Sequence, residues 1–378
     1  MSAQTYLDAN ATAPLRPEAR AAMAAALDLT GNPSSVHRFG RLARRYTEDA
    51  REQVAALVGA RPAQIVFTSG GTEANNLALK GTKAASILVS AIEHDSVLAA
   101  APGAIRIPVT SAGSIDLDAL DRLLAGGERP ALVSVMLANN ETGAIQPIAS
   151  VVERTRAHGA QTHCDAVQAA GRLPISMAEL GVDLLTLSAH KLGGPQGVGA
   201  LVVAEPVGLA PLLGGGGQER GRRAGTENVA AIAGFGAAAA AALAELEKQS
   251  EIGQLRDEME ARACAAVPGT IVFGRAAPRL ANTSCLAMPG LAAETQVMAL
   301  DLAGVAISAG AACSSGKVRA SHVLAAMGCG PEEAGRAIRV SLSWQSTQSD
   351  IDRFVEAWTA LARRRAMSGN DRITLPAA

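Results

Sequence analysis

Aromatic residues are scarce in this sequence and make up 2% of its 378 residues. The chain therefore offers few side chains on which nucleobases could stack. Neither sign of charge dominates, since the formal net charge is −1, and no broad electrostatic field favours nucleic acid or an anionic membrane surface. We expect neither nucleic acid nor a membrane among the partners of this protein.

The sequence also lacks a long hydrophobic run, a signal peptide and a cysteine framework. Its longest apolar run, 229–244, is mostly alanine and falls short of the roughly 20 residues of a membrane-spanning helix, so a buried or dimer-facing helix explains it better. The stretch up to Pro17 has neither the basic nor the apolar region of a signal peptide. The five cysteines are odd in number and form no C-x-x-C, which argues against disulfides and a closed zinc site. We expect a cytoplasmic protein.

Short β-branched runs alternate with helical patterns through the first two thirds of the chain. Such alternation implies crossover connections and a mainly parallel sheet with covered faces. The expected strands are 65–68, 87–90, 131–137, 161–163, 184–188 and 199–203, and the expected helices are 48–58, 73–80, 117–124 and 148–158. The sequence therefore predicts a large α/β domain.

The last third has a different pattern, typical of a smaller α+β domain. An alanine- and glutamate-rich stretch from residue 229 to about 265 predicts a helix that leads out of the large domain. Beyond it we expect strands 271–274, 285–288 and 338–343 and helices 294–303 and 349–364, the last opened by a capping box of Thr347 and Asp350. We expect residues 13–250 to form the large domain and residues 1–12 with 251–378 to form the small one.

Three segments carry the residue types that pyridoxal 5′-phosphate (PLP) requires. Its aldehyde needs a lysine, its pyridinium nitrogen a carboxylate, and its phosphate backbone N–H groups and hydroxyls. Its ring needs a stacking partner, and its phenolate oxygen a hydrogen-bond donor. The sequence predicts a PLP site because these groups are found at the ends of expected strands.

The first segment, 67–73, is a strand followed by a glycine turn and a helix. Gly70 and Gly71 would let backbone amides approach a phosphate at the helix N-terminus, and Thr72 would add a hydroxyl. Seen alone, such a turn is usually structural. It also lacks the lysine of a P-loop.

The second segment, 161–168, places Asp165 at the end of an apolar strand. A carboxylate there is costly unless it is paired with a cation such as a protonated pyridinium. Gln168 could donate to the phenolate oxygen. The alternative interpretation is that Asp165 is the N-cap of a helix.

The third segment, 184–197, places Lys191 between an apolar strand and a glycine-rich turn. Loss of hydration there would lower the pKa of the lysine and favour imine formation. Ser188 and His190 flank it and could reach a phosphate. A lone lysine is usually a solvated surface residue, but this context favours a Schiff base on Lys191.

Two glycine-rich stretches lack the context of nucleotide-binding motifs. The stretch 193–199 is followed by a strand instead of a helix, so it is no dinucleotide fingerprint. Near Lys317, Ala311 replaces the glycine and Val318 the hydroxyl residue of a P-loop. We expect no site for a nucleoside triphosphate.

Taken together and in order, these segments resemble the class V aminotransferase superfamily, and within it the cysteine desulfurases of the NifS/IscS type. The resemblance runs through nearly the whole chain. The matching segments are 6–12, 32–37, 70–73, 93–94, 139–147, 165–168, 188–191, 215–219, 223–228 and 309–315. The resemblance implies a PLP-dependent transferase of fold type I, with a mainly parallel large domain and a smaller α+β domain that carries the catalytic cysteine loop, assembled as a homodimer.

The resemblance also implies a role for each matching position. Lys191 would be the Schiff-base lysine and proton shuttle, Asp165 the pyridinium partner and Gln168 the phenolate donor. His94 would stack on the ring and take part in catalysis. Arg339 suits a carboxylate because its fork forms two hydrogen bonds, although a surface arginine at a strand start is the alternative. The other positions would hold the phosphate (Gly71, Thr72, Ser188, His190 and the partner subunit's Thr226) or lie near the substrate carboxylate or cofactor (Asn32, Asn140 and Arg339).

Cys313 distinguishes a desulfurase from a transaminase, which moves an amino group and needs no thiol. It lies among small residues, 310–316, a composition that suits a mobile loop. Its thiolate would be the nucleophile, and His94 or the substrate-bound cofactor could help to deprotonate it. A small buried cysteine is the alternative. We also consider Cys313 as a transient iron–sulfur ligand, and we expect Cys164, Cys264, Cys285 and Cys329 to be structural.

The activity that the resemblance implies is conversion of L-cysteine to L-alanine with a persulfide left on Cys313. An iron–sulfur scaffold protein or another sulfur carrier would accept the sulfur. The alternatives are a selenocysteine lyase, an aminotransferase of the same fold, and a non-catalytic assembly protein in which Cys313 binds a cluster or a partner. Asp165, Gln168 and Lys191 argue against the last, because a pure scaffold needs no electron sink.

Overall fold

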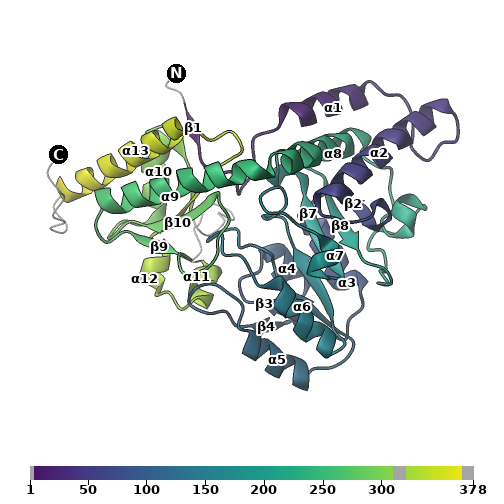
Figure 1. Cartoon of the computed structure of the whole chain (residues 1–378), viewed down its shortest axis with the longest axis horizontal. Helices are drawn as coiled ribbons and strands as arrows, with labels where there is room; N and C mark the ends of the chain where they lie inside the picture. The colour runs from purple at the N-terminus through teal and green to yellow at the C-terminus, as the bar shows by residue number, and fades with distance from the viewer. Residues whose placement is uncertain (1–3, 310–320, 368–378) are drawn as a thin grey trace.

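The computed structural model describes residues 4–309 and 321–367, and its larger part is built around a seven-stranded sheet (Figure 1). In spatial order the strands are β2 (Ile65–Thr68), β8 (Gly199–Val203), β7 (Leu184–Ser188), β6 (Gln161–Asp165), β5 (Ala131–Ser134), β3 (Ser86–Ser90) and β4 (Ile105–Ile107). The strands from β7 to β4 pair in parallel, whereas β8 is antiparallel to both β2 and β7. The predicted mainly parallel sheet is confirmed.

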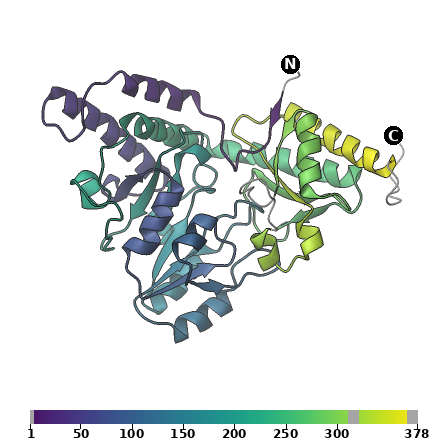
Figure 2. The ribbon, with the colours of Figure 1, turned by 180° about the vertical axis from the view of Figure 1, so that it is seen from behind.

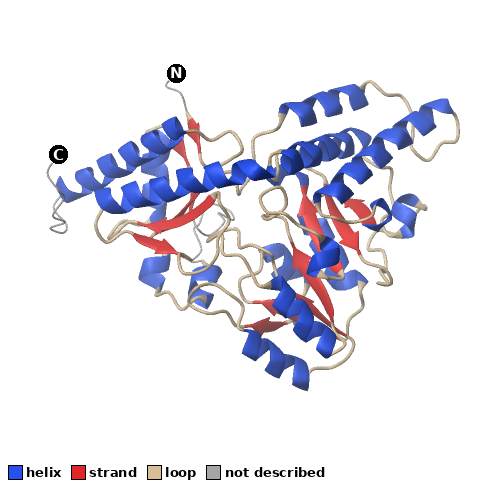
Figure 3. Ribbon diagram, in the orientation of Figure 1, coloured by secondary structure: helices blue, strands red, loops and turns tan. Residues whose placement is uncertain are grey.

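Helices cover both faces of this sheet because its strands are apolar on both faces. Phe67 and Leu187 pack on one face with α2, α5, α6 and α8, and Val66 and Leu184 pack on the other with α3 and α4. Figure 3 shows the strands enclosed between these helices. The helices of this part are α1 (Pro17–Leu27), α2 (Arg38–Leu57), α3 (Gly71–Gly81), α4 (Asp95–Ala100), α5 (Leu117–Gly126), α6 (Ile148–Ala157), α7 (Met177–Leu180) and α8 (Val229–Ala244), with 3₁₀ turns η1 (Pro62–Gln64), η2 (Ala189–Lys191) and η3 (Gln218–Gly221).

The smaller part has its own antiparallel sheet and its own core. Its sheet has the order β12 (Ser308–Ala309), β13 (Ala337–Ser341), β10 (Thr283–Ala287) and β9 (Ile271–Phe273), and the first strand of the chain, β1 (Thr5–Tyr6), pairs in parallel with β11 (Val305–Ala306). Seen from behind, β1 lies beside this part (Figure 2). Its helices are α9 (Gln249–Ala266), α10 (Ala293–Leu302), α11 (His322–Ala326), α12 (Pro331–Ala334) and α13 (Gln348–Met367). Leu7, Phe354 and Trp358 belong to its buried cluster. The domain boundaries at residues 12/13 and 250/251 stay a prediction.

The alanine-rich stretch after Asn228 forms two helices, so the single helix expected over 229–265 is wrong. Helix α8 ends at Ala244, a 3₁₀ turn η4 (Leu246–Lys248) follows, and α9 leaves at a bend of 61°. The Glu245 carboxylate at the bend accepts hydrogen bonds from Arg16 (2.6 Å) and Lys248 (2.7 Å). The bend arises because α8 packs on α1 and α2, whereas α9 packs on α13 in the other core.

The strand expected over 131–137 ends at Ser134, which corrects the prediction. The amides of Val135 and Leu137 still donate to carbonyls of the β6 segment. Between them, however, the Met136 N–H donates to the Glu93 carboxylate at 2.6 Å. The Glu93 side chain therefore replaces a backbone acceptor for the Met136 amide. Regular strand pairing ends at Ser134, just before Met136 reaches the cavity.

Two helix starts also differ from expectation. Helix α2 begins at Arg38, well before the expected residue 48, and the His37 ring accepts a hydrogen bond from the Gly40 amide as its cap. The early turns were missed because they carry arginines and exposed apolar residues in place of a buried stripe. At α13, Asp350 accepts hydrogen bonds from the amide and the hydroxyl of Thr347, so half of the expected capping box is formed.

No single helix among the described residues is long and apolar enough to cross a membrane. Helix α8 and the segment Leu246–Ala266 reach the length and apolar composition of a membrane-spanning helix only when they are joined, and a bend of 61° separates them.

Candidate active site

The carboxyl ends of β2, β3, β5, β6 and β7 meet at one edge of the large sheet, the place where open α/β sheets bind ligands. A cavity of about 450 Å³ lies there, and the smaller sheet closes its other side through Ser308 and Arg339. The volume suits a cofactor or another small molecule. The predicted site residues that line it are Gly71, Thr72, His94, Asn140, Asp165, Gln168, Ser188, His190, Lys191 and Arg339.

Lys191 reaches the cavity from η2, directly after the buried strand β7. Its Nζ donates to the backbone carbonyls of Asn10 (2.6 Å) and Ala11 (2.8 Å). Burial, and after it the positive charges of Arg339 and Arg172, lower the pKa of Lys191 from 10.5 to about 8. With this pKa roughly a tenth of the amine is neutral near pH 7, far more than for an ordinary lysine, and the neutral amine is the nucleophile.

Asp165 lies at the end of β6 with both carboxylate oxygens engaged. Oδ2 accepts a hydrogen bond from Asn75 Nδ2 (2.8 Å), and Oδ1 accepts one from the Val167 amide (3.0 Å). These bonds fix a carboxylate at the cavity wall. The alternative of a helix N-cap is not what the structure has, since the residues after Asp165 form a turn and no helix.

Two titratable groups behind Asp165, Glu93 and His163, are buried, and burial favours the neutral form of each. Burial, and then the Asp165 charge, raise the pKa of Glu93 well above 4.5, which favours its protonated form. Burial lowers the pKa of His163 to about 4, so its ring carries no charge at neutral pH. Of these three groups, Asp165 is the one that lines the cavity.

Gln168 is oriented by a neighbouring cation. Arg172 Nη1 donates to Gln168 Oε1 (2.6 Å), and Arg172 Nη2 donates to the Lys191 carbonyl (3.1 Å). Because the oxygen of the amide is held by Arg172, its nitrogen is the end that donates, and it does so to the Asn10 carbonyl (3.1 Å). The side chain that orients Gln168 thus also holds the backbone of Lys191.

The N-terminus of α3 forms one wall of the cavity and could bind an anion. The helix starts at Gly71 without a side-chain cap, so its first-turn N–H groups are available to a ligand. The preceding turn lies against β8, where a Cβ on Gly199 would come within 2.6 Å of the Gly70 carbonyl carbon. Ser188 and His190 flank this wall. Burial, and then Lys191, lower the pKa of His190 to about 4.

The His94 ring is fixed at the mouth of the cavity. His94 is the N-cap of α4, and its Nδ1 accepts a hydrogen bond from the Ser96 amide (3.1 Å). Asn75 Nδ2 donates to Ser96 Oγ (2.9 Å) as well as to Asp165, which connects the ring to the strand end. With Nδ1 occupied, the exposed remainder of the ring faces the cavity.

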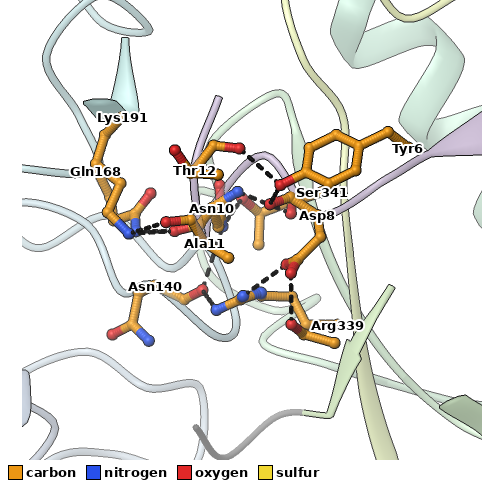
Figure 4. A network of polar contacts seen from close by, with 12 residues as sticks. Tyr6, Asp8, Asn10, Ala11, Thr12, Asn140, Gln168, Lys191, Arg339 and Ser341 are labelled. Carbon is orange, nitrogen blue, oxygen red and sulfur yellow. Dashed lines mark hydrogen bonds and ion pairs between the residues drawn. The ribbon is translucent and has the colours of Figure 1, made fainter. Parts of the chain in front are cut away.

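The opposite wall is a polar network centred on the N-terminal segment (Figure 4). Arg339 donates to Asp8 Oδ1 (2.8 Å) and to the Asn140 carbonyl (3.1 Å). The Asn10 carbonyl receives the bonds from Lys191 and Gln168 already described. The segment that joins these residues passes between the two sheets, so both parts of the molecule contribute to this wall.

The donor set suits PLP. The Lys191 amine of lowered pKa, the fixed Asp165 carboxylate and the Gln168 amide line one cavity at separate points. The N-terminus of α3 and nearby hydroxyl groups line the same cavity at a further point. These are the groups that the aldehyde, the pyridinium, the phenolate and the phosphate need. Among the described residues there is no cluster of His, Cys, Asp and Glu that could hold a metal ion.

Two predicted residues, Asn32 and Thr226, do not line this cavity in the described part of the chain. Asn32 lies in the exposed loop before α2, where its side chain accepts a hydrogen bond from the Ser34 amide. Thr226 lines a separate hollow beside Thr68. Cys313 lies outside the described residues. The roles assigned to these three stay predictions.

Several lining residues were not identified from the sequence. Asn75 follows Gly71 and Thr72 by one helical turn, so helical periodicity could have placed it on the same face. Asn10 and Ser308 lie far in sequence from the other residues of the site, and only the fold brings them there. Asn10, together with Asp8, which does not itself line the cavity, belonged to the matching segment 6–12 but had no predicted role.

Comparison with known proteins agrees with this geometry. Residues 5–354 match the aminotransferase class-V family. A cysteine desulfurase of Cereibacter sphaeroides is 44% identical over 368 residues, covering 93% of this chain and 94% of that protein. The cysteine desulfurase IscS of Dictyoglomus turgidum is 40% identical over 371 residues, 93% of each chain.

The solved structure of a NifS-like protein from Rickettsia africae has the same fold. Its TM-score is 0.89 at 37% sequence identity, covering 95% of this chain and 99% of that one. The predicted fold class is thereby confirmed, and the family implies the use of PLP. The chain belongs to the class V aminotransferase family and, within it, to the cysteine desulfurases.

Proposed function

We propose that this enzyme removes sulfur from L-cysteine with PLP bound at Lys191 and a nucleophile at Cys313. The observation that carries the proposal is the position of the Lys191 amine, of lowered pKa, in a cavity shared with the Asp165 carboxylate and the Arg339 guanidinium. A desulfurase needs these three groups to hold a cofactor, to keep it electron-poor and to receive an amino-acid carboxylate.

The residues around the cavity would hold PLP as follows. Lys191 would bind its aldehyde carbon, Asp165 would pair with the pyridinium nitrogen and Gln168 would donate to the phenolate oxygen. The first turn of α3, with Ser188 and His190, would hold the phosphate. When bound, PLP supplies an electron sink that stabilises negative charge at the substrate Cα.

Two protein side chains would then carry out separate tasks. Arg339 binds the substrate carboxylate through its fork. Lys191 takes the proton from Cα, because its Nζ lies in the cavity and it is partly neutral at physiological pH. Asn140 lies beside Arg339 and lines the same wall.

The sulfur would leave through Cys313. Its thiolate attacks the substrate sulfur, the carbon–sulfur bond breaks and a sulfur–sulfur bond forms. The products are L-alanine and a cysteine persulfide, so that one thiol of the protein and one molecule of L-cysteine account for all atoms. His94, whose ring lines the cavity, would move a proton in this step.

The finer assignments belong to the same proposal. The sulfur acceptor is an iron–sulfur scaffold protein or another sulfur carrier, consistent with the IscS name of a relative. The enzyme would work as a cytoplasmic homodimer, in which the partner subunit's Thr226 would join the phosphate site and Asn32 would be near the substrate or cofactor. Cys313 would also be the residue to bind iron or a cluster transiently.

The test is a substitution of Cys313 in the PLP-loaded enzyme. Cys313→Ser should keep the visible absorbance of the bound cofactor and lose about a hundredfold or more of its sulfide production from L-cysteine with a thiol reductant. Cys264→Ser, which changes a half-buried cysteine of α9, is the control and should turn over like the wild type. Wild-type turnover by Cys313→Ser would refute the nucleophile assignment. Lys191→Ala should lose the cofactor absorbance.

Substrate comparison separates the two alternatives within the family. A selenocysteine lyase would process L-selenocysteine and leave L-cysteine unchanged, and an aminotransferase would need an α-keto acid. We expect L-cysteine to give L-alanine and sulfide without a keto acid.

A further inference from the structure

The guanidinium of Arg339 reaches the cavity with part of its hydrogen-bonding capacity unused. Nη1 donates to Asn140 and Nη2 to Asp8, while Nε is buried and has no partner among the described residues. A guanidinium has five N–H donors in one plane, so these two bonds leave donors for a carboxylate ligand. Its side chain is 9% exposed, so its orientation depends on the groups that hold it.

Asp8 is the charged group that holds this guanidinium, and both its carboxylate and its backbone are fixed by hydrogen bonds. Its Oδ1 accepts the bond from Arg339 (2.8 Å), and its Oδ2 accepts one from Ser308 Oγ (2.8 Å). Its backbone forms a parallel bridge with Ser341, and the Tyr6 hydroxyl donates to its carbonyl (3.0 Å). Asp8 is therefore a fixed support for Arg339 (Figure 4).

The position of Asp8 also matters for the charge balance of the cavity. The positive charges of Arg339 and Arg172 lower the pKa of Lys191, whereas the negative charges of Asp8 and Asp165 raise it. Asp8 thus offsets a cation beside the cofactor lysine, and its bond to Nη2 occupies only one of the five N–H donors of Arg339.

We propose that Asp8 is a positioning residue for substrate recognition, which holds the Arg339 guanidinium in the orientation that receives the α-carboxylate of the amino-acid substrate. This inference rests on the proposed function, because it assumes that Arg339 binds that carboxylate. It has a specific consequence: ligands with a carboxylate depend on Asp8, and amines without one do not.

The alternative is that Asp8 and Arg339 form a purely structural ion pair, which joins the N-terminal segment to β13. Loss of a structural pair would lower stability and affect all ligands of the cavity alike. The two interpretations are therefore separated by comparing ligands, and stability measurements alone do not separate them.

The experiment titrates the PLP-loaded enzyme with two amines and follows the visible absorbance of the cofactor. L-alanine keeps the carboxylate and lacks the thiol, and cysteamine keeps the thiol and lacks the carboxylate. In Asp8→Asn the Kd for L-alanine should rise about tenfold, equivalent to about 1.4 kcal/mol, while the Kd for cysteamine changes less than about twofold. The KM for L-cysteine should rise by a larger factor than kcat falls.

Two further variants keep the test decisive. Glu260→Gln breaks the buried ion pair of Glu260 with Arg279, whose side chains are 6% and 7% exposed, away from the cavity, and it should change neither Kd. Ser308→Ala removes one of the two bonds that hold the Asp8 carboxylate and should shift the Kd ratio of the two amines in the same direction by about threefold. This variant gives the answer if Asp8→Asn does not fold.

An unchanged ratio of the two dissociation constants in Asp8→Asn, or in Ser308→Ala if Asp8→Asn does not fold, would overturn the inference. A failure of the proposed function would look different, since wild-type enzyme would then release no sulfide from L-cysteine. The titrations need only a bound cofactor, so each failure is recognised separately.

Discussion

Lys191 owes its reactivity to its surroundings, because an exposed lysine is almost fully protonated at neutral pH. Burial removes hydration from the ammonium, and two nearby arginines, Arg172 and Arg339, oppose its charge. The Asn10 and Ala11 carbonyls accept its hydrogen bonds and fix its direction. The same side chain can thus act as an anchor for a cofactor and as a base.

Capture of PLP by the cofactor-free protein should depend on pH through this amine. The neutral form is the nucleophile, and with a pKa of about 8 its fraction rises as pH increases through 8, whereas an ordinary lysine would need a pH near 10.5. The rate of cofactor binding, followed by absorbance between pH 6.5 and 9.5, should therefore rise with a midpoint near 8. His190 is neutral across this range, since its pKa is about 4. A midpoint near 10, or full capture by Lys191→Ala, would contradict the assignment.

Individual site residues could be predicted from the sequence when they belonged to local motifs. Asp165, Gln168 and Lys191 follow expected strands, and the structure places all three at one cavity. Asp8 was not assigned a role, because its partners Ser308 and Arg339 lie about three hundred residues away in the chain. No local pattern encodes such a pair.

At the scale of elements, the turn before α3 is held in place by a buried ion pair between α2 and η3. Arg51 donates to both carboxylate oxygens of Glu219 (2.9 Å each) and to the Ile65 carbonyl (2.9 Å). Glu219 also accepts the Phe67 amide (3.0 Å). These bonds connect β2, which leads into the glycine turn, to α2 through Arg51 and to η3 through Glu219.

Breaking this pair from one side should be strongly destabilising. In Arg51→Met the Glu219 carboxylate, 2% exposed, would stay buried without its cation, at a cost of about 3–5 kcal/mol in the free energy of unfolding. The double variant Arg51→Met, Glu219→Met should recover much of this loss. Urea unfolding measures both.

The control for this prediction is Arg45→Met on the same helix. Its pair with Asp49 is 75% and 59% exposed, so the free energy of unfolding should change by less than about 1 kcal/mol. Equal effects of Arg51→Met and Arg45→Met would show that the buried pair does not fasten the turn.

Element prediction succeeded where an apolar pattern was continuous and failed where tertiary contacts decided. Strands β2, β7 and β8 have the expected bounds, since each is a buried apolar run. The break after α8 was not foreseen, because the composition favours one continuous helix and only the two separate cores require a bend.

At the scale of the whole molecule, the N-terminal segment joins the two parts of the protein. Strand β1 pairs with β11 of the smaller part, and the Asn10 carbonyl receives Lys191 and Gln168 of the larger part. The Asn10 side chain donates to Thr283 Oγ1 (2.9 Å) and accepts from Asn282 Nδ2 (2.9 Å). One buried residue thus connects both sheets to the cavity.

Loss of the Asn10 side chain should weaken the protein as a whole. Asn10→Ala leaves the buried groups of Thr283 and Asn282 without this partner, so we expect a loss of about 2–3 kcal/mol in the free energy of unfolding and slower capture of PLP. Asn76→Ala, which removes an amide of α3 whose hydrogen bond to the Thr72 carbonyl is solvent-exposed, is the control and should cost less than about 1 kcal/mol. A stability equal to that of Asn76→Ala, measured by urea unfolding, would contradict the joining role.

The sequence by itself determined the strand–helix order, the residues that follow the strands and the family. It could do so because parallel strands bring their carboxyl ends to one edge, so local motifs placed after strands meet without further information. Only the tertiary structure decided the bend between α8 and α9, the backbone carbonyls that face Lys191 and the pairing of Asp8 with Arg339. These depend on how two cores pack against each other and on contacts between distant segments, which leave no periodic signal in the chain.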